Sequence, residues 1–138
     1  MSIMKNKYVM LFLVLIFGGI YALSAQESEE FDPTRGIDAK ERVERIENLY
    51  AEAEYTQCLQ LIDESIMLND TKKLEFYTTQ FAVVLVYKAL VVYAFREDGY
   101  QQRIKDLLLR VVVTNLNFEF EDYSIIPTYI IDTFVKVQ

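Results

Sequence analysis

One stretch constrains the fold of this chain more than any other: FAVVLVYKALVVYAF, residues 81–95. Every side chain in it is apolar or aromatic except Lys88, which stands at the centre. Such a run is typical of a membrane span, of a buried strand, or of a helix that other helices surround. The choice among these three decides the architecture.

A membrane span is the first interpretation. A membrane-spanning helix needs about 20 consecutive apolar residues. This run is shorter, Lys88 interrupts it, and Arg96, Glu97 and Asp98 follow it directly. We therefore expect no membrane span in this part of the chain. We expect the Lys88 ammonium to reach solvent or a carboxylate, because an unpaired buried charge is costly; a ligand-binding lysine is the alternative.

A buried strand is the second interpretation, because valine and tyrosine favour strands. The segment from Thr71 to Arg96 contains no turn signal, however, and it is longer than ordinary strands. No Asn-Gly or Asp-Gly pair in the chain is followed by an alternating apolar strand. The sequence therefore predicts a buried helix over Thr71–Arg96.

Four further segments carry apolar residues at three- and four-residue spacing, which is the helical period. Two of them begin at Asp38 and Tyr55 and are separated by a break at residues 53–54. The other two follow the central helix and cover residues 101–114 and 127–137. Five helices joined by short turns predict an all-α domain.

Residues 1–25 have the three-part layout of a secretory signal peptide. A positively charged start precedes the apolar run 8–20, and small residues follow as far as Ala25. We expect cleavage after Ala25, which would leave Gln26 as the first residue; the alternatives are a cut after Ser24 and a retained N-terminal anchor. We expect an exported protein in the periplasm of a Gram-negative bacterium, with secretion from the cell as the alternative, and no transmembrane span once the signal is removed.

Residues 26–37 (QESEEFDPTRGI) are acidic and have no apolar period, which predicts a flexible, solvated leader. The remaining residues 38–138 are enough for one small helical domain. The chain has a net charge of −7, and removal of Lys5 and Lys7 with the signal would make it more acidic. A chain this acidic lacks the excess of positive charge that binds nucleic-acid phosphates, so we expect no nucleic-acid partner.

Two stretches share one pattern: ENLYAEAEYTQCLQLI (47–62) and VYAFREDGYQQRIKDLLL (92–109). Each has an aromatic residue, a few polar or small residues, a tyrosine, and then an amphipathic helix. The pattern resembles the middle of a tetratricopeptide repeat, in which a Gly-Asp-Tyr-like turn joins two antiparallel helices. The matching positions are Tyr50, Ala53, Tyr55 and Cys58 in the first stretch and Gly99 and Tyr100 in the second.

The stretch from residue 107 to residue 134 resembles the end of a group of small exported bacterial tetratricopeptide-like domains. The resemblance implies two stacked antiparallel helix pairs and a C-terminal capping helix, with Ile130 and Phe134 packed on the fourth helix. It also implies a protein–protein interaction module, a scaffold or adaptor that presents a concave helical surface to a protein partner.

The sequence contains no signature of an enzyme. It has no histidine and a single cysteine, which excludes the commonest metal sites, nucleophile arrangements and general base. Only two glycines, Gly36 and Gly99, follow residue 25, so there is no glycine-rich phosphate loop. Cys58 lies on an apolar face and is typical of a buried packing thiol, with a reactive thiol as the alternative. We expect no catalytic activity, no cofactor and no metal.

Acidic and aromatic residues alternate in the loop between the last two helices. Phe118, Phe120, Glu121 and Tyr123 could form a partner-binding rim. The alternation favours a second arrangement, in which the aromatic rings tuck inward and the acids face water.

Two other functions stay open at this point. The protein could carry a small ligand or a lipid in an aromatic-lined cavity. It could instead be a subunit of a homo-oligomer or of an envelope complex, burying leftover apolar surface against other copies.

Overall fold

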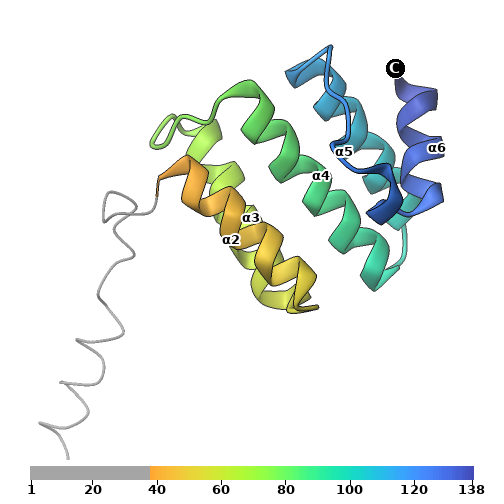
Figure 1. Cartoon of the computed structure of the whole chain (residues 1–138), viewed down its shortest axis with the longest axis horizontal. Coiled ribbons are helices and arrows are strands. Elements are labelled where there is room, and N and C mark those ends of the chain that lie inside the picture. The colour runs from red at the N-terminus through yellow and green to blue at the C-terminus, as the bar shows by residue number, and fades with distance from the viewer. Residues whose placement is uncertain (1–37) are drawn as a thin grey trace, which may run out of the picture. The chain divides into compact units, whose positions relative to one another are not determined.

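A computed structural model describes residues 38–138, which form five α-helices and one 3-10 turn and contain no strand (Figure 1). The all-α class predicted from the sequence is confirmed. The predicted signal peptide, the cleavage site at Ala25 and Gln26, and the acidic leader lie outside the described residues. The elements are α2 (Ala39–Ala51), α3 (Tyr55–Asp70), α4 (Thr78–Phe95), α5 (Tyr100–Thr114), η1 (Tyr123–Ile125) and α6 (Thr128–Val137).

The apolar run of the sequence forms α4, which packs against α2, α3 and α5 (Figure 1). Val84 and Val91 belong to an apolar cluster shared with α2 and α3. Leu85 and Ala89 belong to a second cluster, shared with α5 and α6. The helix is apolar on nearly all sides because it has neighbours on both sides.

In length and composition α4 could cross a membrane, and no other helix within residues 38–138 could. Half of this span is buried inside the domain.

The central helix begins later than the sequence predicts, at Thr78 instead of Thr71. Lys72 adopts a left-handed conformation with φ 58° and ends α3. The backbone N–H of Lys73 then donates to the carbonyl of Leu68, at 2.9 Å. The chain runs without regular structure until Tyr77, whose N–H donates to the Gln80 side chain at 3.0 Å. The other helix starts lie within a residue of their predicted positions.

Residues 115–126, which we call the strap, connect α5 to α6. Phe118 and Phe120 of the strap are buried, and their ring centroids lie 6.1 and 5.0 Å from that of Phe134 in α6. Ile130 and Phe134 are buried in the cluster that includes Ile104 of α5. The predicted packing of the last helix on its predecessor is confirmed, and it fixes the strap in place.

Candidate functional site

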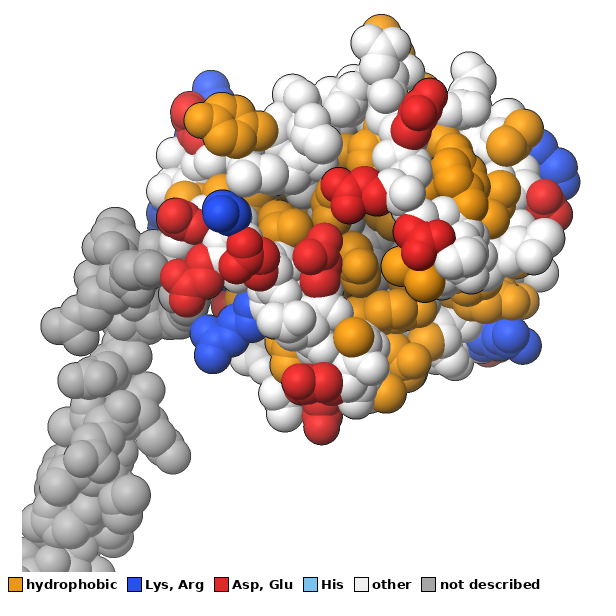
Figure 2. Space-filling model, in the orientation of Figure 1, with side chains coloured by type: hydrophobic (Ala, Val, Ile, Leu, Met, Phe, Trp, Pro, Cys, Tyr) orange, Lys and Arg blue, Asp and Glu red, His pale blue; other side chains and the backbone are white. Residues whose placement is uncertain are grey.

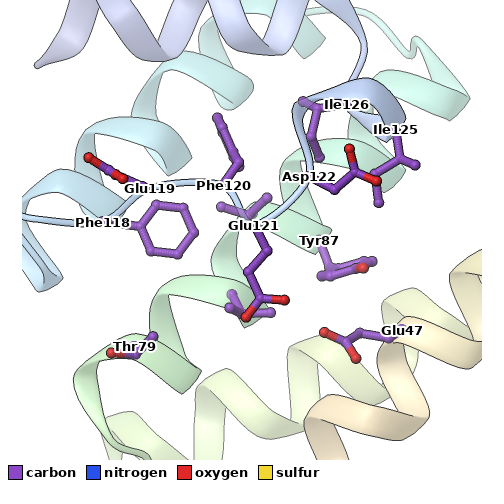
Figure 3. A pocket seen from close by; sticks show the side chains of 12 residues that line it. Glu47, Thr79, Tyr87, Phe118, Glu119, Phe120, Glu121, Asp122, Ile125 and Ile126 are labelled. Atoms are coloured by element: carbon purple, nitrogen blue, oxygen red, sulfur yellow. The ribbon is translucent and has the colours of Figure 1, made fainter.

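A recess of about 150 Å³ lies between α2, α4 and the strap, and we call it the strap recess (Figure 3). α4 contributes Val83, Val86 and Tyr87, which share one helical face because they are three and four residues apart. The strap contributes most of the rest. The apolar lining side chains, apart from Tyr87, are Val83, Val86, Phe118, Phe120, Ile125 and Ile126.

The strap alternates between buried aromatic and exposed acidic side chains. Phe118 and Phe120 are only 6% and 7% exposed, whereas Glu119 and Glu121 are exposed. In an extended segment successive side chains point in opposite directions, so burying one set exposes the other. Of the four residues proposed as a partner-binding rim, Phe118 and Phe120 line the recess with buried rings and Glu121 lines it with an exposed side chain. Tyr123 is 49% exposed and does not line it.

Four carboxylates border the recess, from Glu47 of α2 and from Glu119, Glu121 and Asp122 of the strap. In Figure 3 the Glu47 and Glu121 carboxylates approach from opposite sides, whereas Glu119 points away from them. Within residues 38–138 none of the four forms an ion pair. Figure 2 shows acidic side chains around an apolar patch on this face.

Burial and the neighbouring negative charges raise the pKa values of two recess residues, Glu47 and Tyr87. Burial raises the pKa of the Glu47 carboxyl above its ordinary value, and the neighbouring Glu121 and Glu44 raise it further. Burial raises the pKa of the Tyr87 hydroxyl to about 12, with Glu47 and Glu121 among the contributing charges. At neutral pH the recess therefore presents a protonated phenol beside two carboxylates that repel each other.

Asp122 has a separate, local role. Its carboxylate accepts hydrogen bonds from the Ser124 hydroxyl at 2.6 Å and from the Ser124 N–H at 2.9 Å. These bonds lower the pKa of Asp122 and cap the turn η1. Asp122 therefore stabilises the shape of the strap, and Glu47 and Glu121 remain as the two carboxylates that face the recess.

The first repeat-turn residues lie behind this site. The ring centroid of Tyr50 is 5.5 Å from that of Tyr55 and 5.4 Å from that of Tyr87. Ala53 ends the turn in a left-handed conformation, with φ 59°. The fully buried Cys58 thiol contacts the carbonyl of Ile46, with sulfur and oxygen 3.5 Å apart, and burial raises its pKa to about 11. Cys58 thus has the surroundings of a packing thiol.

The second repeat-turn residues lie apart from the recess. Gly99 has φ 77° at the start of α5, a conformation that suits glycine. The ring of Tyr100 lies 6.4 Å from that of Tyr93 and 6.3 Å from that of Tyr129, and the rings of Tyr93 and Tyr129 stack at 5.4 Å. None of the six repeat-turn residues lines the recess, and Tyr50 of the first turn contacts it through the ring of Tyr87.

Two further depressions, of about 340 and 310 Å³, lie along α5 and carry mainly cationic side chains, with Lys105 and Lys136 in the first and Arg103 and Arg110 in the second. Lys88 forms an ion pair with Asp63 of α3, with 2.8 Å between Nζ and Oδ1. Of the two outcomes expected for this lysine, solvent or a carboxylate, the structure shows the carboxylate, with the side chain 30% exposed. In the described part of the chain, no group of three or more His, Cys, Asp or Glu side chains is placed to hold a metal ion.

Of the recess residues, the sequence singled out only Phe118, Phe120 and Glu121; Glu47 and Tyr87 are the two candidate functional residues that it missed. Glu47 is one of several acids on an amphipathic helix, and Tyr87 is one aromatic residue in an apolar run. No local pattern marks either of them, because the strap brings the site together by folding back over α4. Comparisons with models of known protein families, with curated proteins and with solved structures find no match to this chain.

Proposed function

We propose that this protein is an exported protein–protein interaction module with no catalytic activity of its own, and that the strap recess is its docking site. One observation carries the proposal: two facing carboxylates that form no ion pair within residues 38–138 border an apolar recess on the face of α2 and α4. Such an arrangement weakens the isolated domain and gains stability when a complementary group binds.

Aromatic contacts join α2 to α4 and α4 to α6. Tyr50 near the end of α2 contacts Tyr87 of α4, and Tyr93 near the end of α4 contacts Tyr129 of α6. The first contact joins two helices that pack side by side, whereas the second joins the end of α4 to the start of α6, a helix that packs on α5. In a stacked array, the first helices of successive pairs line a concave surface, and the strap recess lies between α2 and α4.

The size of the recess favours a protein partner over a carried ligand. Sites for small molecules usually enclose about 300–1,000 Å³, whereas an apolar cavity of about 150 Å³ is known to accommodate benzene. The strap recess, at about 150 Å³, therefore suits one side chain better than a lipid.

Self-association is the second candidate function. Leu109 and Val113 lie one helical turn apart on α5, and both are exposed, as is Leu116 just beyond the helix. An exposed apolar row of this kind favours contact with another copy. Sedimentation of the wild type and of Val113→Glu would test it, with a concentration-dependent dimer in the wild type alone as the supporting result.

Site-specific photocrosslinking in the producing cells tests the docking site. A photoreactive residue replaces Ile125, which borders the recess and is 64% exposed, or Val113, which is 73% exposed and lies outside it. We expect one stoichiometric protein partner crosslinked at position 125 and absent at position 113. Crosslinks to a partner only at position 113, or no partner at position 125, would contradict the proposal.

Export is tested on the same material. Cleavage after Ala25 predicts that the accumulated protein begins at Gln26, which intact-mass measurement of the soluble envelope fraction would detect. An intact protein recovered from the membrane fraction would favour the retained anchor.

A further inference from the structure

We infer that the strap recess accepts a lysine or arginine side chain of the partner, carried on a segment with apolar neighbours. The inference rests on the proposed function and specifies the chemistry of the partner at the same site.

The first step concerns charge. Glu47 and Glu121 face each other across the recess, and each raises the pKa of the nearby Tyr87 hydroxyl. Their mutual repulsion is relieved when a cation lies between them, because an opposite charge within about 4–6 Å favours the ionised carboxylate. A guanidinium or ammonium group also supplies hydrogen-bond donors, and a donor is what two carboxylates require.

The second step concerns shape. The surface beside the two carboxylates is apolar and includes Val83, Val86 and Ile126. Lysine and arginine pack their aliphatic stems on such surfaces while the charged head reaches a polar group. A volume of about 150 Å³ fits this single amphipathic side chain. A wholly apolar side chain would leave the two carboxylates without a partner.

The third step concerns the cations of the chain itself. The ion pairs Lys88–Asp63 and Arg110–Asp70, at 2.8 and 2.6 Å, connect α3 to α4 and α5, and neither cation lines the recess. Lys105 and Lys136 line a separate depression between α5 and α6. A second copy could present those lysines, but two copies that each carry a net charge of −7 repel. The same charge attracts a basic segment of a different protein.

Peptide binding tests the inference directly. The full-length gene is expressed with ¹⁵N labelling, and the protein is isolated in the form that the cells accumulate. Three blocked peptides, acetyl-Ala-Leu-X-Leu-Ala-amide with X as lysine, glutamine or glutamate, are titrated while amide chemical shifts are recorded. We expect the lysine peptide to bind at millimolar concentration and to shift the amides of Tyr87 and Glu121. The glutamine peptide should bind about tenfold more weakly, and the glutamate peptide more weakly still.

Variants separate the recess from general acidity. Glu47→Gln combined with Glu121→Gln should remove the preference for the lysine peptide. Glu52→Gln, an exposed acid of the same helix end that does not line the recess, should retain it. Equal binding of the three peptides, absence of binding by the lysine peptide, or retention of its preference in the double variant would overturn the inference.

The crosslinking experiment distinguishes the two proposals. If position 125 captures a partner through a segment without lysine or arginine, the inference fails and the docking site stands. If position 125 captures only a second copy of this chain, both the inference and the separate protein partner are wrong. If it captures nothing, the docking site fails as well.

Discussion

The Glu47 carboxylate lies in surroundings that disfavour its charge in the folded domain. Its pKa is raised in the folded protein, so the folded state favours the protonated carboxyl. The resulting destabilisation is absent below the ordinary carboxyl pKa and appears as the pH rises through the raised value. At neutral pH the isolated domain therefore bears a cost that a cationic partner would remove.

We expect Glu47→Gln to stabilise the protein at pH 7, by about 0.5 kcal/mol, because it removes one of the two facing charges. The gain in stability should disappear at about pH 4, because Glu47 of the parent protein is then largely protonated and therefore uncharged, like glutamine. Urea denaturation at the two pH values measures it, with Glu52→Gln as the matched control. If the variant were no more stable than its parent at pH 7, repulsion between Glu47 and Glu121 would not lower the free energy of unfolding.

For single residues, the sequence predicted which strap side chains are buried, because that depends on local alternation. It did not predict which residues meet across the recess, because that depends on the path of the chain. The inward position of Phe118 and Phe120 follows from their alternation with Glu119 and Glu121. The meeting of Glu121 with Glu47 depends on where the strap crosses α4, and neither residue's neighbours in sequence carry that information.

Among the elements, α6 has the clearest structural role, because it fixes the strap. Its Phe134 lies in one cluster with both strap phenylalanines. We expect Phe134→Ala to lower the free energy of unfolding by about 3–5 kcal/mol, the usual loss for a buried phenylalanine. Val135→Ala, at a 63% exposed position of the same helix, should change it by less than about 0.5 kcal/mol. Thermal melts that rank the two variants equally would contradict the role of α6.

The start of α4 shows where sequence patterns mislead. Lysine and leucine are good helix formers, so local propensity favours a continuous helix through Lys72, Lys73 and Leu74. In the structure Lys72 turns left-handed and the N–H groups of the next two residues bond to the carbonyl of Leu68. These hydrogen bonds close the last turn of α3 and outweigh the helix propensity of the residues that follow it.

That turn provides a further prediction. A left-handed residue with a Cβ costs about 1–2 kcal/mol, and glycine avoids most of this cost. We expect Lys72→Gly to raise the free energy of unfolding by about 0.5–1 kcal/mol. Lys73→Gly, one residue along and without positive φ, should lower it or leave it unchanged. Chemical denaturation of the pair measures the difference, and the opposite ranking would exclude a strained turn at Lys72.

For the whole domain, two apolar clusters meet at α4 and both include buried groups with raised pKa values. The Cys58 thiol reaches about 11 and the Tyr87 hydroxyl about 12, against ordinary values of 9.0 and 10.0. The stability linked to these protons is complete below the ordinary values and is lost as the pH rises through the raised ones.

We therefore expect the domain to keep its urea midpoint up to about pH 8 and to lose stability progressively above about pH 9, first through Cys58 and then through Tyr87. Tyr87→Phe should lose less over that range, because it has no hydroxyl proton to release. Helical circular dichroism measured in a urea series at each pH provides the test. Identical alkaline profiles for the two proteins would show that the Tyr87 hydroxyl does not drive the transition.

The overall class was predictable from the sequence because four segments show helical periodicity, each with an apolar face that needs a neighbour, and the fifth is apolar on nearly all sides. The path of the strap was not, because it depends on contacts between residues 118 and 134 that form only when α6 has docked. The candidate site could not be predicted for the same reason, because the strap forms one of its walls.

The attachment of the strap to α6 also has a genetic consequence. One wall of the recess depends on a helix that contributes no residue to it. Alleles that abolish partner binding should therefore fall into two groups, one at Glu47 and Glu121 and the other at Ile130 and Phe134. Only the second group should also reduce the amount of protein that cells accumulate, and only it should be rescued by growth at lower temperature.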